Sequence, residues 1–274
     1  MKSTIGDLAA PPAKTPLIDP RPGSANSTAD RALDVLLSFT EERPNSSVSE
    51  MANFLGMARS TLYRYLNSLR EYGLVVEDES GRYRLGPRIL QLARVARRNV
   101  TVLQFATPHM HALRDEFDEI IVLSERVGHE VITLERLESR QLVTLSDVRS
   151  QILPWPISAT ARALLAFAEQ EDAEELIRHL QPVTPTAKTI GTVAMLRAEL
   201  GCIRQRGYAL SIDQLADDVS GVAAPVMRDG KCRYALALAA PTARLPKAKL
   251  TAVSVALCEH GRAITHELQM LSPN

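Results

Sequence analysis

Hydrophobic residues between positions 47 and 72 recur at the spacing of two short helices joined by a tight turn. In the first helix, one apolar stripe occupies the i, i+3, i+4 and i+7 positions: Val48, Met51, Ala52 and Leu55. Ser47 and Glu50 form a capping box at its start. Gly56 suits its end, because glycine adopts the left-handed conformation at little cost. The second helix is predicted to bury Leu62, Tyr65, Leu66 and Leu69.

The opposite face of the second helix is polar and basic. It carries Arg59, Ser60, Tyr63, Arg64 and Asn67. This layout is typical of a helix-turn-helix, whose second helix reads base edges in the DNA major groove. An ordinary amphipathic helical hairpin is the alternative, and the segments on both sides decide between the two.

The flanking pattern predicts a winged helix-turn-helix. A helix is expected from Thr28 to Glu41, with an apolar stripe at Ala29, Ala32, Leu33, Leu36 and Leu37. Pro44 and Asn45 are expected to break the chain before the Ser47 helix. Gly73 is then followed by two short apolar strands, at 74–76 and 82–85, which predict a β-hairpin with its tip near Ser80 and Gly81.

The pattern changes after this hairpin. Pro87 opens a linker helix that ends near residue 99, with Ile89, Leu92, Ala93 and Ala96 along one side. From Val100 onward, helices are expected at 101–117, 158–168, 171–179, 192–206 and 246–271. Strands are expected at 120–126, 130–137, 141–145, 208–212, 219–227 and 232–239. Together they predict an α+β domain with an antiparallel sheet flanked by helices.

Composition narrows the class of protein. The 274 residues suffice for two domains, and no apolar run reaches the ~20 residues of a membrane span. Residues 1–27 contain five prolines and no apolar period, so they are expected to form a disordered arm without a signal peptide. Three widely spaced cysteines fit a reduced, cytoplasmic protein.

The net charge of zero hides a local cluster of cations. Residues 28–98 hold 11 Lys/Arg against 9 Asp/Glu, and no acid lies between Arg82 and Arg98. Beside a helix-turn-helix, such a run favours contact with DNA phosphates over a merely solvated face.

The sequence gives no indication of an enzyme or a cofactor. It lacks the G-x-S-x-G, G-x-G-x-x-G and GKS/GKT motifs. His109 and His111 diverge on a helix, and no metal site is expected from them or from His129, His179 and His260. Asp213, Asp217 and Asp218 are interpreted as a solvated charge run on a loop.

Several segments, in order along the chain, resemble the IclR family of transcriptional regulators. They are RALDVLLSF, SVSEMANFLGMARSTLYRYLNSLREYGLV, GRYRLGPRILQLAR, LPWPISATARALLA, LRAELGCIRQRGYAL and SGVAAPVMRDG. The resemblance implies a winged-helix domain at 28–86, a linker helix at 87–99 and a GAF-like effector-binding domain at 100–274. It also implies a homodimer or a tetramer that binds a palindromic operator in double-stranded DNA, and no membrane.

Residue by residue, the resemblance implies DNA contacts from the reading helix and the wing. Together with two flanking polar residues, the expected DNA-binding set is Ser47, Arg59, Ser60, Thr61, Tyr63, Arg64, Asn67, Arg82 and Arg84. The implied effector pocket lies between the sheet and the start of the ATARALLA helix. Its expected lining is Leu142, Ile152, Leu153, Trp155, Ser158, Ala159, Thr160, Ser211, Asp213, Gly221, Val222, Ala237 and Ala239.

The pocket positions depart from those of family members that bind small polar acids. Ala237 and Ala239 occupy positions where those members often carry hydroxyls, and Gly221 and Val222 are also not polar. This predicts few side-chain donors and a larger or more apolar carboxylic acid, for instance an aromatic one. Backbone N–H groups at the helix start would bind its carboxylate without a cationic side chain. Two alternatives remain: these positions simply pack a core, or the C-terminal domain serves only oligomerisation.

Overall fold

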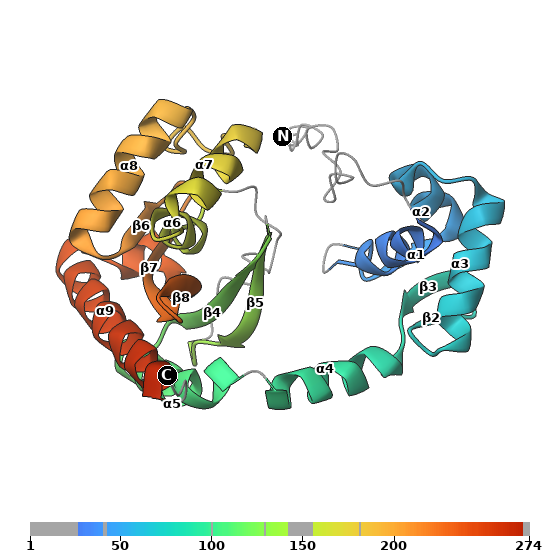
Figure 1. The fold of residues 1–274 in the computed structure, drawn as a ribbon, viewed down its shortest axis with the longest axis horizontal. Helices are drawn as coiled ribbons and strands as arrows, with labels where there is room; N and C mark the ends of the chain where they lie inside the picture. Colours follow the sequence, from blue (N-terminus) through green and yellow to red (C-terminus); the bar gives the residue numbers. More distant parts are fainter. Residues whose placement is uncertain are drawn as a thin grey trace, which may run out of the picture. The chain divides into compact units, whose positions relative to one another are not determined.

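The computed structural model describes residues 27–40, 43–99, 101–128, 130–141, 156–180 and 182–270. They form two compact units that divide between Arg94 and Val95 (Figure 1). Of the predicted arm, only Ser27 lies within the described residues. The expected strand at 141–145, apart from Gln141, and His129 also lie outside them.

The N-terminal unit contains three helices and a small antiparallel sheet. The helices are α1 (Thr28–Leu37), α2 (Val48–Leu55) and α3 (Arg59–Glu71). The strands are β1 (Asn45–Ser47), β2 (Val75–Glu77) and β3 (Arg82–Leu85), in the order β1-β3-β2. The buried stripes of α2 and α3 enter one core with Val35, Phe39 and Tyr83. The predicted winged helix-turn-helix is therefore confirmed.

Two details of this unit differ from the sequence prediction. Helix α1 ends at Leu37 rather than Glu41, and Leu33 and Leu37 are 54% and 60% exposed instead of buried. The reason is the orientation of α1, which turns Val35 into the core and leaves the predicted stripe partly outside it. The expected break at Asn45 is instead a third strand, because Asn45 pairs with Arg84 and Ser47 with Arg82.

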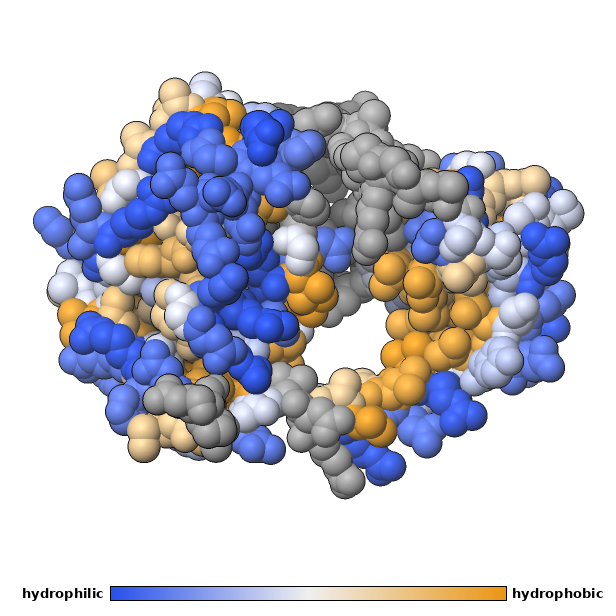
Figure 2. Space-filling view, viewed as in Figure 1, coloured by the Kyte–Doolittle hydropathy of each residue, from blue (hydrophilic) through white to orange (hydrophobic). Residues whose placement is uncertain are grey.

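Helix α4 (Pro87–Asn99) follows the wing. Of its predicted apolar side, only Ile89 is partly buried, whereas Leu92, Ala93 and Ala96 are exposed. Leu90 on the same helix is 75% exposed. The apolar side chains of α4 are thus available to a partner, and Figure 2 shows them among the apolar surface of the N-terminal unit.

The C-terminal unit is built on a five-stranded antiparallel sheet in the order β5-β4-β8-β7-β6. The strands are β4 (Ile120–Val127), β5 (Glu130–Leu137), β6 (Ala209–Ile212), β7 (Val219–Arg228) and β8 (Lys231–Pro241). The helices are α5 (Thr101–Phe117), α6 (Ala159–Ala166), α7 (Gln170–His179), α8 (Val193–Arg206) and α9 (Lys247–Met270), with a 3₁₀ turn at Thr242–Arg244.

Helices cover the two faces of this sheet and create two separate cores. Helices α5 and α9 pack on one face, where Met110, Leu123 and Leu257 are fully buried. Helix α6 lies on the other face, and α7 and α8 complete its core (Figure 1). This confirms the predicted α+β class. Among the helices of the described residues, none is long and apolar enough to span a membrane.

Candidate DNA-binding and effector sites

The exposed face of α3 carries the residues predicted to read DNA. Arg59, Ser60, Tyr63, Arg64 and Asn67 are all exposed, and Tyr63 is 48% exposed. Thr61, the sixth predicted residue of this helix, is only partly exposed. Ala58, the N-cap residue, provides no side-chain hydrogen bond to the helix start. The first turn of α3 therefore presents backbone N–H groups beside basic side chains, an arrangement that suits phosphate.

A hydrogen-bond network holds the C-terminal half of this face against the wing. Asn67 accepts a hydrogen bond from Arg70 at 3.0 Å, and Arg70 forms an ion pair with Glu77 at 2.7 Å. The Tyr83 hydroxyl donates to the same Glu77 carboxylate at 3.0 Å. Burial and this carboxylate raise the pKa of Tyr83. The network fixes β2 and β3 relative to the reading helix.

Two of the residues predicted to contact DNA, Ser47 and Arg82, form hydrogen bonds within the protein at the start of α2. Ser47 is its N-cap: its hydroxyl accepts from the Glu50 amide, and its own amide donates to the Glu50 carboxylate at 2.7 Å. Hydrogen bonds from Ser47 are the main reason that the pKa of Glu50 is lowered. Arg82 bonds Glu50 at 2.9 Å and Asn45 at 3.1 Å, whereas Arg84 on the same strand is exposed. Of the two wing arginines, Arg82 is thus held by contacts within the unit and Arg84 is the more exposed.

The wing tip is acidic, a feature that the sequence prediction did not use. The Asp78 carboxylate accepts hydrogen bonds from the Ser80 hydroxyl and amide and from the Arg82 amide. These bonds, the Ser80 hydroxyl first, lower its pKa. Gly81 completes the turn at φ +75°, a conformation that favours glycine.

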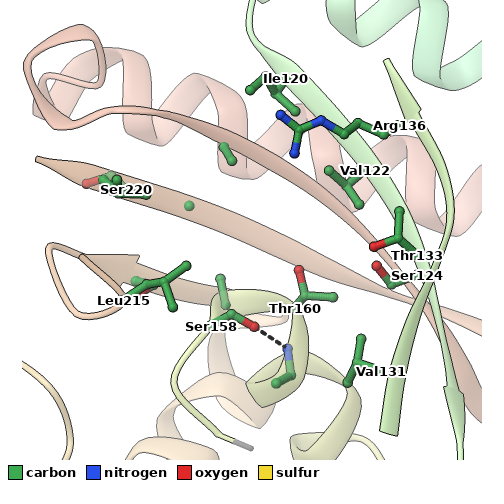
Figure 3. A pocket seen from close by; sticks show the side chains of 16 residues that line it. Ile120, Val122, Ser124, Val131, Thr133, Arg136, Ser158, Thr160, Leu215 and Ser220 are labelled. Atoms are coloured by element: carbon green, nitrogen blue, oxygen red, sulfur yellow. Dashed lines mark hydrogen bonds between the residues drawn. The ribbon is translucent and has the colours of Figure 1, made fainter. Parts of the chain in front are cut away.

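A cavity of about 110 Å³ lies between the sheet of the C-terminal unit and the start of α6 (Figure 3). Apolar or small side chains form most of its wall, and hydroxyl groups and one arginine supply the polar positions. Its lining is Ile120, Val122, Ser124, Val131, Thr133, Arg136, Ser158, Ala159, Thr160, Ala161, Ser211, Leu215, Val219, Ser220, Gly221 and Ala239.

The structure brings together six of the residues predicted for the pocket. They are Ser158, Ala159, Thr160, Ser211, Gly221 and Ala239. Asp213, Val222 and Ala237 do not line the cavity. The other four predicted residues, Leu142, Ile152, Leu153 and Trp155, lie outside the described residues.

Strand alternation accounts for one of the three residues that lie away from the cavity. Val222 follows Gly221 on β7, so its side chain points to the opposite face and packs in the α5–α9 core. Ala237 lies on the same face of β8 but two residues before Ala239, where it packs in the core formed with α6, α7 and α8. Both positions therefore pack cores, as the alternative to pocket lining anticipated.

Asp213 has a structural role beside the cavity. Its carboxylate pairs with Lys188 at 2.6 Å and accepts a hydrogen bond from the Thr242 hydroxyl. The hydrogen bond from Lys188, and after it the one from Thr242, lowers the pKa of Asp213. The Thr186 hydroxyl donates to the Asp213 carbonyl at 2.7 Å. These bonds hold the segment around Thr186 against the loop that carries Leu215 into the cavity wall.

Sequence reasoning missed the contribution of the β4–β5 hairpin. Val122 pairs with Arg136 and Ser124 with Thr133, and all four line the cavity. In a regular strand, residues 133 and 136 would lie on opposite faces because side chains alternate. A register shift between Leu123 and Ser124 places both on the cavity side. The sequence does predict two adjacent strands here, but the alternation within each strand carries no information on the bulge between them.

The start of α6 supplies the directional polar groups of the cavity. Ser158 is the N-cap, and its hydroxyl accepts from the Ala161 amide at 3.1 Å (Figure 3). The Ser158 carbonyl accepts from the Arg162 amide. The amides of Ala159 and Thr160, which come first in the helix, have no acceptor among the described residues. Helix geometry points such N–H groups along the helix axis, past its N-terminus, and Ala159 and Thr160 both line the cavity.

The described residues contain no group of three or more His, Cys, Asp or Glu that could hold a metal ion. Two histidines, His109 on α5 and His260 on α9, lie side by side, with their Nδ1 atoms 2.7 Å apart. Glu267 lies 3.4 Å from Nε2 of His109. At so short a separation, one imidazole must be a neutral acceptor.

Comparisons with known proteins match both units. The family described as "Bacterial transcriptional regulator IclR C-terminal" matches residues 95–266, and the "IclR helix-turn-helix domain" matches residues 28–79. The chain belongs to the IclR family. It is a helix-turn-helix, DNA-binding transcriptional regulator, and its relatives are named as regulators rather than as enzymes.

Two relatives illustrate the likeness in sequence. The regulator KipR of Bacillus subtilis is 29% identical over 201 residues, which cover 73% of this chain and 80% of KipR. The regulator Rv1719 of Mycobacterium tuberculosis is 32% identical over 208 residues, covering 75% of this chain and 78% of the relative.

Solved structures show the same architecture. A putative IclR regulator from Silicibacter has a TM-score of 0.79 at 28% identity, covering 90% of this chain and 98% of that one. An IclR homologue from Microbacterium hydrocarbonoxydans has a TM-score of 0.76 at 24% identity, covering 89% of this chain and 100% of that one. The Microbacterium protein was crystallised in complex with 4-hydroxybenzoate.

Proposed function

We propose that this regulator binds its operator through α3 and senses a small organic carboxylic acid in the cavity of its C-terminal unit. The observation that carries the proposal is the cavity itself, which lies at the start of α6, where two amides have no acceptor among the described residues. A pocket of mostly apolar walls with a few convergent polar groups is the usual form of a small-molecule site.

The chemistry of the cavity favours an acid with an apolar body. The amides of Ala159 and Thr160 suit a carboxylate, because a helix N-terminus carries partial positive charge. Gly221 and Ala239 offer no hydroxyl, as the sequence predicted, but Ser124 and Thr133 on the hairpin do. The ligand is therefore expected to carry its carboxylate at α6 and an apolar part along the sheet.

The size of the cavity limits the ligand to a short chain or a single ring. Its volume of about 110 Å³ approaches that of an engineered cavity of roughly 150 Å³ that binds benzene. The Microbacterium homologue, with 4-hydroxybenzoate, provides a precedent in this family for a single-ring acid. An aromatic or similarly apolar acid is the effector class that we propose.

The proposed DNA contacts are those of α3 and the wing. Arg59, Ser60, Tyr63, Arg64 and Arg84 are exposed on the N-terminal unit. The exposed leucines of α1 and α4, namely Leu33, Leu37, Leu90 and Leu92, would be covered in a homodimer. A dimer places two reading helices on two half-sites, so a roughly palindromic operator is expected.

A proline substitution at the first helical position tests the acid site directly. Ala159→Pro removes one amide donor from α6, and the helix tolerates proline there because the N–H has no intrahelical partner. The preceding Ser158 has φ −76° and ψ 156°, which is compatible with a following proline. Ala159→Val is the matched control, since it adds similar bulk but keeps the amide.

The measurements are ligand-induced changes in melting temperature and in operator affinity, over a panel of aromatic and aliphatic acids. An acid that raises the melting temperature of the wild type should lose much of that effect with Ala159→Pro and keep more of it with Ala159→Val. If no acid stabilises the protein or alters DNA binding, the C-terminal unit serves assembly alone and the proposal is wrong.

A further inference from the structure

Arg136 is the single charged side chain among the described residues that line the cavity. Its side chain is 23% exposed, so most of its surface is within the protein. Figure 3 shows its guanidinium beside Ile120 and Val122, across the cavity from the start of α6. The cavity therefore has two groups that attract anions, one at each side.

The bulge in the β4–β5 hairpin gives Arg136 this position. Because of the register shift between Leu123 and Ser124, Arg136 faces the cavity in a pair with Val122, while Thr133 faces it in a pair with Ser124. Without the shift, one of the two β5 side chains would turn to the α5–α9 core. Bulges are known to re-aim side chains next to functional sites.

One partner of Arg136 is an exposed carboxylate, with which a ligand carboxylate can compete. Nε of Arg136 bonds Glu138 at 2.6 Å, and the Glu138 side chain is 57% exposed. Ion pairs with so exposed a partner contribute little, because solvent competes for both charges. A carboxylate held within the cavity would meet the same guanidinium in a less hydrated setting, where the planar fork suits it well.

From this placement, we propose that the effector is a dicarboxylic acid, held by the start of α6 at one end and by Arg136 at the other. The inference rests on the proposed function, because it assigns the second end of the same site. Arg136 is then the residue that distinguishes diacids from monoacids of equal length. The apolar wall of the cavity between the two ends selects a ligand whose middle is hydrocarbon.

Calorimetric titration of the full-length protein with matched pairs of acids tests the inference. 4-Methylbenzoate is compared with terephthalate, and butyrate with succinate, so that in each pair one methyl group is exchanged for a carboxylate. The variants are Arg136→Gln, which removes the charge, and Arg136→Lys, which keeps it. Arg126→Gln is the matched control: Arg126 is on the same hairpin, 20% exposed and paired with Asp172 at 2.8 Å, but does not line the cavity.

The wild type is expected to bind one diacid at least tenfold more tightly than its monoacid partner. Arg136→Gln should abolish that preference while leaving monoacid affinity within about twofold, and Arg136→Lys should restore part of it. Arg126→Gln should bind like the wild type. Equal affinity of the wild type for both members of each pair would overturn the inference but not the acid-sensing function.

Two further outcomes would also count against the inference. If Arg136→Gln and Arg126→Gln weaken diacid binding equally, the effect belongs to the general charge of the hairpin and not to the cavity. If the wild type binds none of the four probes and no acid of the wider panel, the acid-sensing function fails as well.

Discussion

Gly86 lies between the wing and α4, and substituting it tests how tightly the DNA-binding unit is packed. Its amide donates to the Leu74 carbonyl at 2.7 Å, directly after the end of α3. A Cβ built at Gly86 would lie 2.2 Å from the Gly73 carbonyl oxygen and 2.9 Å from its carbon. Gly73 has φ +70° and completes the C-terminal cap of α3, so it has little freedom to move.

The expected cost of Gly86→Ala follows from that overlap. Ordinary contact needs 3.4 Å or more, so the backbone must separate by more than an ångström. Overpacking a rigid site costs ~1–3 kcal/mol and occasionally more, and a clash with backbone belongs at the upper end. For a domain of 60–100 residues, each kcal/mol lowers the melting temperature by about 4–8 °C. We therefore expect the N-terminal unit to melt roughly 10–25 °C lower.

Differential scanning calorimetry of the full-length variant is the assay, combined with a mobility-shift assay on operator DNA. The transition of the C-terminal unit should stay unchanged, while the N-terminal transition and DNA affinity fall. Gly201→Ala is the control, since nothing lies within 4 Å of its added Cβ in helix α8. That change should be neutral or stabilise by up to ~1 kcal/mol. A Gly86→Ala protein that melts within about 3 °C of the wild type would refute the packing argument.

Three further outcomes are expected. Arg64→Ala should weaken specific operator binding about tenfold or more in a mobility-shift assay, since a bidentate arginine–guanine contact is worth ~1–3 kcal/mol; equal loss with Arg197→Ala, on α8 of the C-terminal unit, would argue against a reading role. Cys232 should resist thiol reagents at pH 8 until the protein unfolds, because burial raises its pKa to about 12, whereas exposed Cys202 should react quickly; mass spectrometry of labelled peptides decides. Burial and the neighbouring histidine lower the pKa of His260, so the unfolded chain takes up a proton that the folded chain resists. Stability should therefore fall as pH drops below ~6.5, and His260→Gln should flatten the pH dependence of the C-terminal melting temperature.

Secondary structure was predictable because its signals are local. Strand β5 occupies Glu130–Leu137 and α5 occupies Thr101–Phe117, both as the periodicity predicted. The buried stripe of α3 was also correct, since a helical period needs only one chain segment to define it. Strand β1 was missed because three residues next to a proline carry no pattern, and only pairing with β3 makes them a strand.

The candidate sites were predictable to different degrees for the same reason. The exposed face of α3 comes from one helix, so the helical period alone predicts which polar residues lie on it. In the cavity, neighbouring residues on a strand point in opposite directions, and Gly221 and Val222 were both assigned to it although only Gly221 lines it. Arg82 was assigned to DNA from its position alone, but its contacts with Glu50 arise from a fold that brings two distant segments together.

Arg136 shows where such reasoning reaches a physical limit. Its position in the cavity depends on which residue of β4 it opposes, and a one-residue change of register would turn its side chain to the other face of the sheet. Register is set by packing across both faces and by the bulge, neither of which is visible in the alternation of β5 itself. The sequence does not distinguish Arg136 from a solvated cation on a strand, yet in this sheet Arg136 is part of the polar lining of the cavity. With Arg136 in its proposed role, a bulge alone would change the ligand selectivity of such a domain, without any substitution at the residues that touch the ligand.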